Sequence, residues 1–318
     1  MRAYHRDEDG AAQPLEDSTV LIVGAAGFLG QEITRAFARR GSKVRGLIRD
    51  PARAEIVRSA GGEPVVGNVL DIESLTKHAQ GCAAIVHVAA NPSEVPDPRD
   101  LAREVRVRGA GNIIEAARAN RVRRVIIGSG YWVYADQPGI ITEQSRVDPQ
   151  GESRDNYDAE RAGLEANAPP ELEVLVGRPG MVYGDGAWFR PVLEGIRKGT
   201  YRVIDGGTNH WSFVSLPDTA SAFCTIAEKG TAGEVYNIVD GNPRPWAEFA
   251  HFVAETVGAP GPGSMSFEEA VATYGRVVAT HLRANRATSA GKLRALGWKP
   301  AYARFQEGVA PLLANVRR

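Results

Sequence analysis

The stretch TVLIVGAAGFLGQEITRAFARRG, residues 19–41, decides the fold of this chain. Residues 19–24 form an apolar run that stops at a glycine, which is typical of a buried strand. Residues 30–41 place Ile33, Ala36 and Phe37 on one helical face and end at another glycine, which predicts a helix. The order of strand, glycine-rich turn and helix predicts a site for the phosphates of a dinucleotide.

The turn itself contains Gly24, Gly27 and Gly30. A pyrophosphate needs a close approach to the backbone and free amides at a helix N-terminus, and a Cβ at these positions would block both. The alternative is a turn that is rich in glycine only for tight packing. The strand before it and the helix after it favour nucleotide binding.

Strand and helix patterns alternate beyond this unit. A long helix is predicted over 101–121 and another around Tyr157, and further strands are predicted over 43–48, 63–67, 83–88, 123–129 and 172–179. This alternation predicts an α/β fold in which helices cover both faces of a parallel sheet. After residue 187 we expect mainly helices without regular strand partners.

Composition excludes several classes of protein. Lys+Arg and Asp+Glu are both 38 in 318 residues, and a neutral chain is a poor ligand for nucleic acid. Cys82 and Cys224 are far apart and flanked by small or apolar residues, so we expect buried, inert thiols and no metal site. The longest apolar run is too short to span a membrane, and the N-terminus has charges where a signal peptide is apolar. A cytoplasmic protein with a flexible tail at 1–17 is predicted.

Several short motifs stand in a recognisable order. They are the glycine turn, GNVLD (67–71), HVAA (87–90), SGYWVYAD (129–136), YDAER (157–161), GRPGMVYGDG (177–186) and LGWKP (296–300). Together they resemble the extended short-chain dehydrogenase/reductase superfamily, whose members include NAD-dependent epimerases and dehydratases. The resemblance covers nearly the whole chain after residue 18.

The resemblance implies a Rossmann-type, doubly wound parallel sheet that binds NAD(P), with a smaller, mainly helical C-terminal lobe over the substrate. We expect the dinucleotide-binding domain at 18–186 with a contribution from 201–240, and the substrate lobe at 187–200 and 241–318. The partner is then a small molecule, and a homodimer is compatible with this class.

The same resemblance assigns the cofactor contacts position by position. The pyrophosphate would be held by Gly24, Gly27, Phe28, Leu29 and Gly30. The adenine would be flanked by Asn68 and Val69. Ala89 and Ala90 would lie along the ribose and its phosphates, and Pro179 and Val182 would lie near the nicotinamide.

The end of the second strand bears on the choice of cofactor. An acidic residue there binds the ribose 2′-hydroxyl of NAD, whereas an arginine accepts the 2′-phosphate of NADP. This chain has Arg49, and Arg53 follows shortly after. Because a guanidinium suits a phosphate, NADP is favoured, although Asp50 leaves NAD open and Arg49 could be a solvated surface charge.

The catalytic positions depart from the family pattern. Most relatives use an Asn, a Ser or Thr, a Tyr and a Lys together. The motifs place Arg106 at the Asn, Ser129 at the first of two serines and Gly130 at the second, which is usually the catalytic one. Tyr157 is retained, and Arg161 replaces the Lys.

These changes weaken redox chemistry without excluding it. Arg161 can bind the ribose and lower the pKa of Tyr157, but it cannot pass a proton to solvent because guanidinium stays charged. Loss of a hydroxyl at Gly130 is a change that costs about 10² to 10³ in rate, unless Ser129 or Tyr131 substitutes. Halohydrin dehalogenases also pair a Tyr with an Arg, but they lack an intact glycine turn. The alternative is a plain surface helix in which Arg161 pairs with Asp158 or Glu165.

The substrate lobe offers weaker signals. Nucleotide-sugar members have an Arg-Asp-Phe where this chain has HWSF, with His210 and Trp211, so a sugar nucleotide is disfavoured. Tyr131, His210 and Trp211 are candidates for a pocket that takes an apolar molecule, and His210 is also a candidate acid or base. The aromatic residues of this lobe could equally form its core.

Three hypotheses follow. The first is an NADP-dependent oxidoreductase acting on a carbonyl or secondary alcohol of a small, largely apolar molecule, with Tyr157 as acid/base and Arg161 and Ser129 assisting. The second is a non-redox isomerase, lyase or cyclase that keeps bound NAD(P) as a structural, electrostatic or transiently cycled group. The third is a nucleotide-sensing protein without chemistry.

Overall fold

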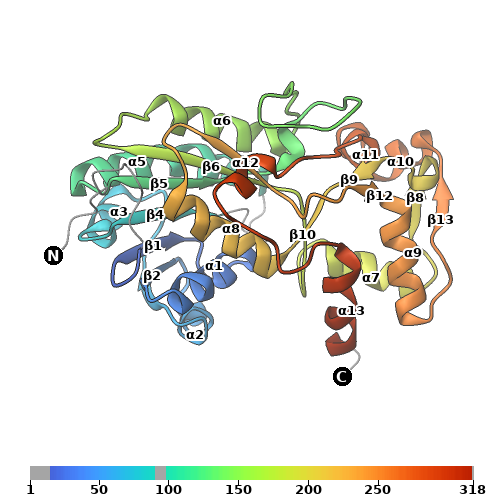
Figure 1. The fold of residues 1–318 in the computed structure, drawn as a ribbon, viewed down its shortest axis with the longest axis horizontal. Helices are drawn as coiled ribbons and strands as arrows, with labels where there is room; N and C mark the ends of the chain where they lie inside the picture. The colour runs from blue at the N-terminus through green and yellow to red at the C-terminus, as the bar shows by residue number, and fades with distance from the viewer. Residues whose placement is uncertain (1–14, 90–97, 317–318) are drawn as a thin grey trace.

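The computed structural model describes residues 15–89 and 98–316. Seven parallel strands form the central sheet in the order β11-β6-β5-β4-β1-β2-β3 (Figure 1). Their bounds are β1 Thr19–Val23, β2 Lys43–Ile48, β3 Glu63–Val66, β4 Ala84–His87, β5 Arg124–Gly128, β6 Glu173–Pro179 and β11 Val235–Ile238. This order, which reverses direction at β1, confirms the predicted doubly wound fold.

The strands are apolar on both faces because helices cover both. Val20 and Ile22 of β1 pack into one core, and Leu21 and Val23 pack into the core on the opposite face. Such continuous apolar runs are the mark of a parallel sheet that is buried on both sides.

Figure 1 shows the two helical layers. One face carries α1 (Phe28–Arg39), α2 (Ala54–Ser59), α8 (Leu216–Lys229) and α12 (Gly291–Ala295). The other carries α3 (Ile72–Ala79), α5 (Gly109–Asn120) and α6 (Glu152–Glu165). Short 3-10 turns lie at η1 (Pro51–Arg53), η3 (Tyr131–Val133) and η4 (Asp205–Gly207).

The long helix predicted over 101–121 is interrupted. It consists of α4 (Pro98–Arg103), a π-helical turn η2 (Glu104–Arg108) and α5. A π turn accommodates an extra residue and redirects the side chains it carries, and such turns are frequent at functional sites. Sequence periodicity does not reveal it, because one inserted residue leaves the apolar pattern of α5 intact.

The smaller lobe is mainly helical, as predicted. Its helices are α7 (Phe189–Arg197), α9 (Trp246–Val257), α10 (Phe267–Tyr274), α11 (Arg276–Arg283) and α13 (Phe305–Val316). Short strand pairs that the sequence did not suggest join them: β7 (Met181–Tyr183) with β10 (Phe213–Ser215), β8 (Arg202–Ile204) with β13 (Gly263–Met265), and β9 (His210–Trp211) with β12 (Arg244–Pro245). Strands of two or three residues are too short for an alternating pattern to appear.

The segment 201–240 is divided between the two parts of the molecule. Its β8 pairs with β13 in the lobe, whereas its α8 packs on α1 and its β11 extends the large sheet. The domain limits expected from the sequence stay a prediction.

Aromatic rings form the core of the lobe. Phe213 and Phe249 stack with ring centroids 4.7 Å apart, and Trp246 stacks on Phe249 at 5.1 Å. Elsewhere, Cys82 and Cys224 are free thiols, and both are buried as predicted. Within the two described ranges, every helix is too short or too polar to cross a lipid bilayer.

Candidate active site

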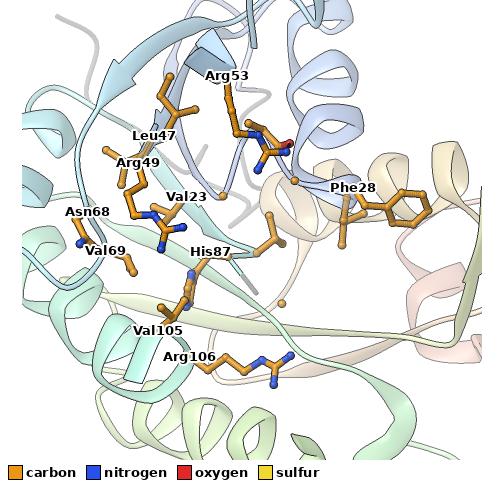
Figure 2. Close-up of a pocket in the computed structure, with 18 of the residues that line it drawn as sticks. Val23, Phe28, Leu47, Arg49, Arg53, Asn68, Val69, His87, Val105 and Arg106 are labelled. Atoms are coloured by element: carbon orange, nitrogen blue, oxygen red, sulfur yellow. Dashed lines mark hydrogen bonds between the residues drawn. The ribbon is translucent and has the colours of Figure 1, made fainter. Parts of the chain in front are cut away.

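A cleft of about 540 Å³ opens at the C-terminal ends of β1, β2, β4 and β5. This is where open α/β sheets bind their ligands, and the volume lies within the range of small-molecule pockets. Figure 2 shows the side chains that line it, with Arg49, Asn68 and Val69 on one side and Arg106 and Phe28 reaching toward the other.

The glycine turn closes the cleft at the end of β1. Gly24 has a φ of +93°, and a Cβ there would lie 2.7 Å from the backbone of Ala89. A Cβ at Gly30 would collide with the carbonyl oxygen of Gly24. Gly24 is therefore required by its left-handed backbone and the close approach of the chain after β4, and Gly30 by the close packing of α1 on the turn.

The N-terminus of α1 faces the cleft. Gly27 is its N-cap residue and has no side chain to cap the first amides, and Gly27, Phe28 and Leu29 all line the cleft. Uncapped amides and the positive end of the helix dipole suit an anion such as a pyrophosphate.

The side of the cleft beside β2 and β3 is basic. Arg49 extends into the cleft (Figure 2) and makes no ion pair with a described residue. Arg53 also lines it and donates a 2.7 Å hydrogen bond to the carbonyl oxygen of Ala26 in the glycine turn. Asp50 also lies here, but its carboxylate accepts from the amide of Ala52 and caps η1.

The expected adenine contacts also lie on this side. Asn68 and Val69 both line the cleft, and the Asn68 side chain accepts a 3.0 Å hydrogen bond from the amide of Leu70. Ala89 lines the cleft at the end of β4, whereas Ala90 lies outside the described residues.

His87 supports the floor of the cleft. Burial lowers its pKa to about 4, backbone hydrogen bonds to Arg106 and Val105 oppose this shift, and the charge of Arg106 adds to it. A neutral imidazole is therefore held against η2 at physiological pH. His87 is better placed to fix this π turn than to exchange protons.

Ser129 is held by a buried ion pair. Its hydroxyl donates a short hydrogen bond to Glu160, and Glu160 also accepts two hydrogen bonds from Arg178, one of them 2.9 Å long. Glu160 and Arg178 are buried, so the hydroxyl of Ser129 stabilises an internal pair although the residue lines the cleft. Glu160 lies within YDAER, and its role was not predicted from the sequence.

Gly130 leaves space where a side chain could stand. An added Cβ would meet Trp132, the carbonyl oxygen of Pro179 and the side-chain Nδ2 of Asn156 at 3.7, 3.8 and 3.9 Å, which are ordinary contacts. Asn156 lines the cleft and forms no hydrogen bond through its amide with any described residue. Asn156 directly precedes Tyr157 and was not predicted as a site residue from the sequence.

Tyr157 and Arg161 are neighbours on α6, as predicted. Glu165 first, and Tyr157 beside it, raise the pKa of Arg161, whose guanidinium is exposed and pairs with Glu165 at 2.5 Å. The surface pair considered as an alternative is therefore present, but it leaves Arg161 next to the phenol. Tyr157 is half-buried against the aromatic core of the lobe and is not among the residues that line the cleft.

Arg106 lies across the cleft from the glycine turn. Its side chain is 13% exposed, and its Nη2 is 3.7 Å from the carboxylate of Glu152 at the start of α6. Its Nη1 is buried and has no hydrogen-bond partner among the described residues. In Figure 2 the guanidinium points into the open cleft, away from Asn68 and Val69.

The residues expected to form a substrate pocket do not line this cleft. Tyr131 and Trp211 are fully buried in the lobe core, where Trp211 packs on Trp246 at 4.2 Å, and His210 is exposed on β9.

The two residues predicted near the nicotinamide do not line this cleft either. Pro179 is buried beside Gly130, and Val182 is half-buried and accepts a hydrogen bond from the indole of Trp188 through its carbonyl oxygen. Their roles stay predictions.

Comparisons with known proteins agree with this geometry. The sequence model of the NAD dependent epimerase/dehydratase family matches residues 20–239. The 4-hydroxy-2-methyl-3-oxo-4-farnesyl-3,4-dihydroquinoline-1-oxide ketoreductase of Stigmatella aurantiaca is 30% identical over 257 residues, covering 78% of this chain and 76% of its own. The 3-diazoavenalumate denitrifying reductase of a Streptomyces species is 28% identical over 306 residues, covering 91% and 98%.

The fold also matches solved structures. The crystal structure of dTDP-glucose 4,6-dehydratase from Streptomyces venezuelae, solved with NAD bound, has a TM-score of 0.78 at 21% identity and covers 94% of this chain and 97% of its own. At this identity the likeness shows the fold alone.

Proposed function

The chain belongs to the NAD-dependent epimerase/dehydratase family of extended short-chain dehydrogenases/reductases and is an NAD(P)-dependent enzyme; from this premise we propose that it is an NADP-dependent oxidoreductase. It interconverts a carbonyl and a secondary alcohol on a small, largely apolar molecule. The relatives named as a ketoreductase and a reductase support this choice among the activities of the family. The observation that carries it is Asn156, which lines the cleft beside Gly130 and directly precedes Tyr157 on α6.

Arg49 and Arg53 support NADP over NAD. Both line the cleft where the second strand ends, and the nearby Asp50 uses its carboxylate to cap η1. A ribose 2′-phosphate would give Arg49 the anionic partner that it lacks among the described residues. When bound, the cofactor supplies or accepts a hydride at the nicotinamide ring.

Tyr157 would give its phenolic proton to the carbonyl oxygen during reduction and recover it in the reverse direction. The guanidinium of Arg161 is a cation beside the phenolate that this transfer leaves behind. Arg161 cannot carry the proton onward, because its own pKa is raised still further above the working range. Solvent must therefore reprotonate Tyr157.

Asn156 would replace the hydroxyl that is missing at Gly130. Its Nδ2 lies 3.9 Å from the point where a serine Cβ would stand, and its amide is not engaged by a described residue. An amide donor that binds the substrate oxygen would stabilise the negative charge developing there.

A second candidate function is a non-redox isomerase, lyase or cyclase. It is favoured by one observation, the arginine at position 161, which preserves charge but removes a proton relay. Such an enzyme would form product without a net change in the nicotinamide.

Absorbance of the reduced nicotinamide separates these proposals. Purified protein with NADPH and a panel of hydrophobic ketones should consume NADPH in proportion to alcohol formed. Tyr157→Phe should reduce turnover by about 10² to 10⁴ while cofactor affinity is kept. Tyr274→Phe, at an exposed tyrosine of the lobe, is the matched control. Product formation without NADPH loss would favour the second function, and full activity of Tyr157→Phe would exclude Tyr157 as the acid.

A further inference from the structure

Arg106 is a cation that the protein itself does not neutralise well. Only 13% of its side chain is exposed, yet its Nη1 has no hydrogen-bond partner among the described residues. Its one described ionic neighbour, Glu152, is 3.7 Å from Nη2 and has a side chain 68% exposed. That distance and exposure make the pair weak.

Two other acidic residues of α6, the helix that begins at Glu152, pair with a different arginine. Asp155 and Asp158 both pair with Arg103, at 2.7 and 2.9 Å. Arg106 therefore stays a charged donor in the wall of a ligand cleft. A buried donor of this kind is costly unless a ligand completes its hydrogen bonds.

The fold holds this side chain in place. Arg106 lies in the π turn η2, which redirects side chains relative to a regular helix. The ring of His87 is buried beside this turn, and its pKa is lowered first by that burial and further by the charge of Arg106. The guanidinium consequently points into the cleft, as Figure 2 shows.

We propose that Arg106 binds a carboxylate of the substrate, so that the enzyme acts on an oxo acid with an apolar remainder. This proposal rests on the proposed function and narrows its substrate class. A planar guanidinium with free donors matches a carboxylate. The cofactor phosphates would have other partners across the cleft, at the N-terminus of α1 and at Arg49, both of which line it. Reduction would transfer a hydride from NADPH to the carbonyl carbon and a proton from Tyr157 to its oxygen, giving a hydroxy acid and NADP⁺.

Matched acids and esters test the charge preference on the wild-type protein. The probes are 2-oxooctanoate and 3-oxooctanoate, each against its methyl ester, titrated by calorimetry into protein saturated with NADP⁺. At least one acid should bind about 10- to 100-fold tighter than its ester, the range expected for a charge-assisted hydrogen bond. Equal or tighter binding of both esters, or no binding of either acid, overturns the proposal.

Variants connect the preference to Arg106. Arg106→Gln should abolish the difference between acid and ester, and Arg106→Lys should restore part of it. Arg108→Gln, at an exposed arginine of the same turn that pairs with Glu104, is the control. NADP⁺ should bind Arg106→Gln and wild type equally, and a parallel loss of NADP⁺ affinity would make Arg106 a cofactor contact and overturn the proposal.

The two proposals can fail separately. Arg106-dependent binding of an acid without NADPH consumption would support the carboxylate site and reject the redox function. Consumption of NADPH with esters and acids at equal KM would support the redox function and reject the carboxylate site.

Discussion

The two sides of the cleft follow the family pattern to different degrees. The side formed by the glycine turn and β2 keeps the pattern, because its geometry is set by the main chain: Gly24 and Gly30 have no room for a Cβ. The side formed by η2, the end of β5 and α6 departs from it at Arg106, Gly130 and Arg161. On this side the lining is formed by side chains, such as those of Arg106 and Asn156.

The difference shows which parts of such a site are constrained by folding and which by chemistry. A cofactor groove built from amides and close packing tolerates few substitutions. The opposite side has arginines, Arg106 and Arg161, at the positions where the resemblance implies an asparagine and a lysine, and a buried charge there needs hydrogen-bond partners. Four predictions can break or sharpen this contrast.

The largest effect is expected at Gly27. Its φ of −76° is accessible to any residue, and an added Cβ would meet only the carbonyl oxygen of Gly24, at 3.2 Å. Gly27→Val should therefore fold after a small local shift, yet the new side chain would stand where the pyrophosphate would meet the amides of α1. We expect a loss of NADP affinity of at least about 100-fold, measured by calorimetry, because several charge-assisted hydrogen bonds are lost together. Gly111→Val, at a helical glycine whose Cβ would meet nothing within 4 Å, is the control.

Retained affinity in a folded Gly27→Val protein would mean that the phosphates bind elsewhere. The main-chain side of the cleft would then lose its assigned role, and the contrast between the two sides would disappear.

The next effect concerns Asn156 and Gly130. Asn156→Ala should lower kcat by about 10² to 10³ if its amide holds the reacting oxygen. Gly130→Ser in the same protein should recover part of this loss, because an added Cβ has only ordinary contacts there. Structural damage alone would not be repaired by a hydroxyl on another element. Absence of both loss and recovery would remove Asn156 from the mechanism.

A smaller effect is expected at Arg49. Arg49→Ala should weaken NADP binding by about 1–3 kcal/mol and leave NAD unchanged, because only NADP has a 2′-phosphate. Arg58→Ala, at an exposed arginine of α2 that is not among the cleft-lining residues, is the control. Equal losses for the two cofactors in calorimetric titrations would contradict the assignment.

The sequence predicted the fold well because its signals are local. The alternation of apolar strands and amphipathic helices determines the layers, and the glycine turn marks where the cleft begins. The π turn at Glu104–Arg108 and the short strand pairs of the lobe were missed, since they extend over too few residues to produce a period.

The site was predicted unevenly for a related reason. Arg49, Asn68 and the turn glycines stand at fixed positions of motifs, so position alone located them. Asn156 and the Glu160–Arg178 pair matter through contacts between distant segments, and no local pattern encodes such contacts. The aromatic residues of the lobe could not be divided between pocket and core until their packing was known, and Trp211 proved to be core.

The smallest effect is expected at Arg161, where the side chain is 57% exposed and pairs with Glu165. Arg161→Lys keeps the positive charge beside Tyr157, so NADP affinity and kcat at neutral pH should stay within about fivefold of wild type, as for other exposed pairs.

The informative measurement is the pH profile of kcat. Glu165 and Tyr157 raise the pKa of Arg161, so the guanidinium stays charged and adds no ionisation to the wild-type profile. The lysine of the variant can lose its proton near its ordinary pKa of about 10.4, so a second ionisation should appear at alkaline pH. The lysine at position 161 should also speed the reprotonation of Tyr157, because an amine can relay protons and a guanidinium cannot. Identical pH profiles of kcat for wild type and Arg161→Lys would show that the side chain at position 161 does not affect proton transfer by Tyr157. In that case the pair with Glu165 would be only a surface contact, and Tyr157 would act without the cation beside it.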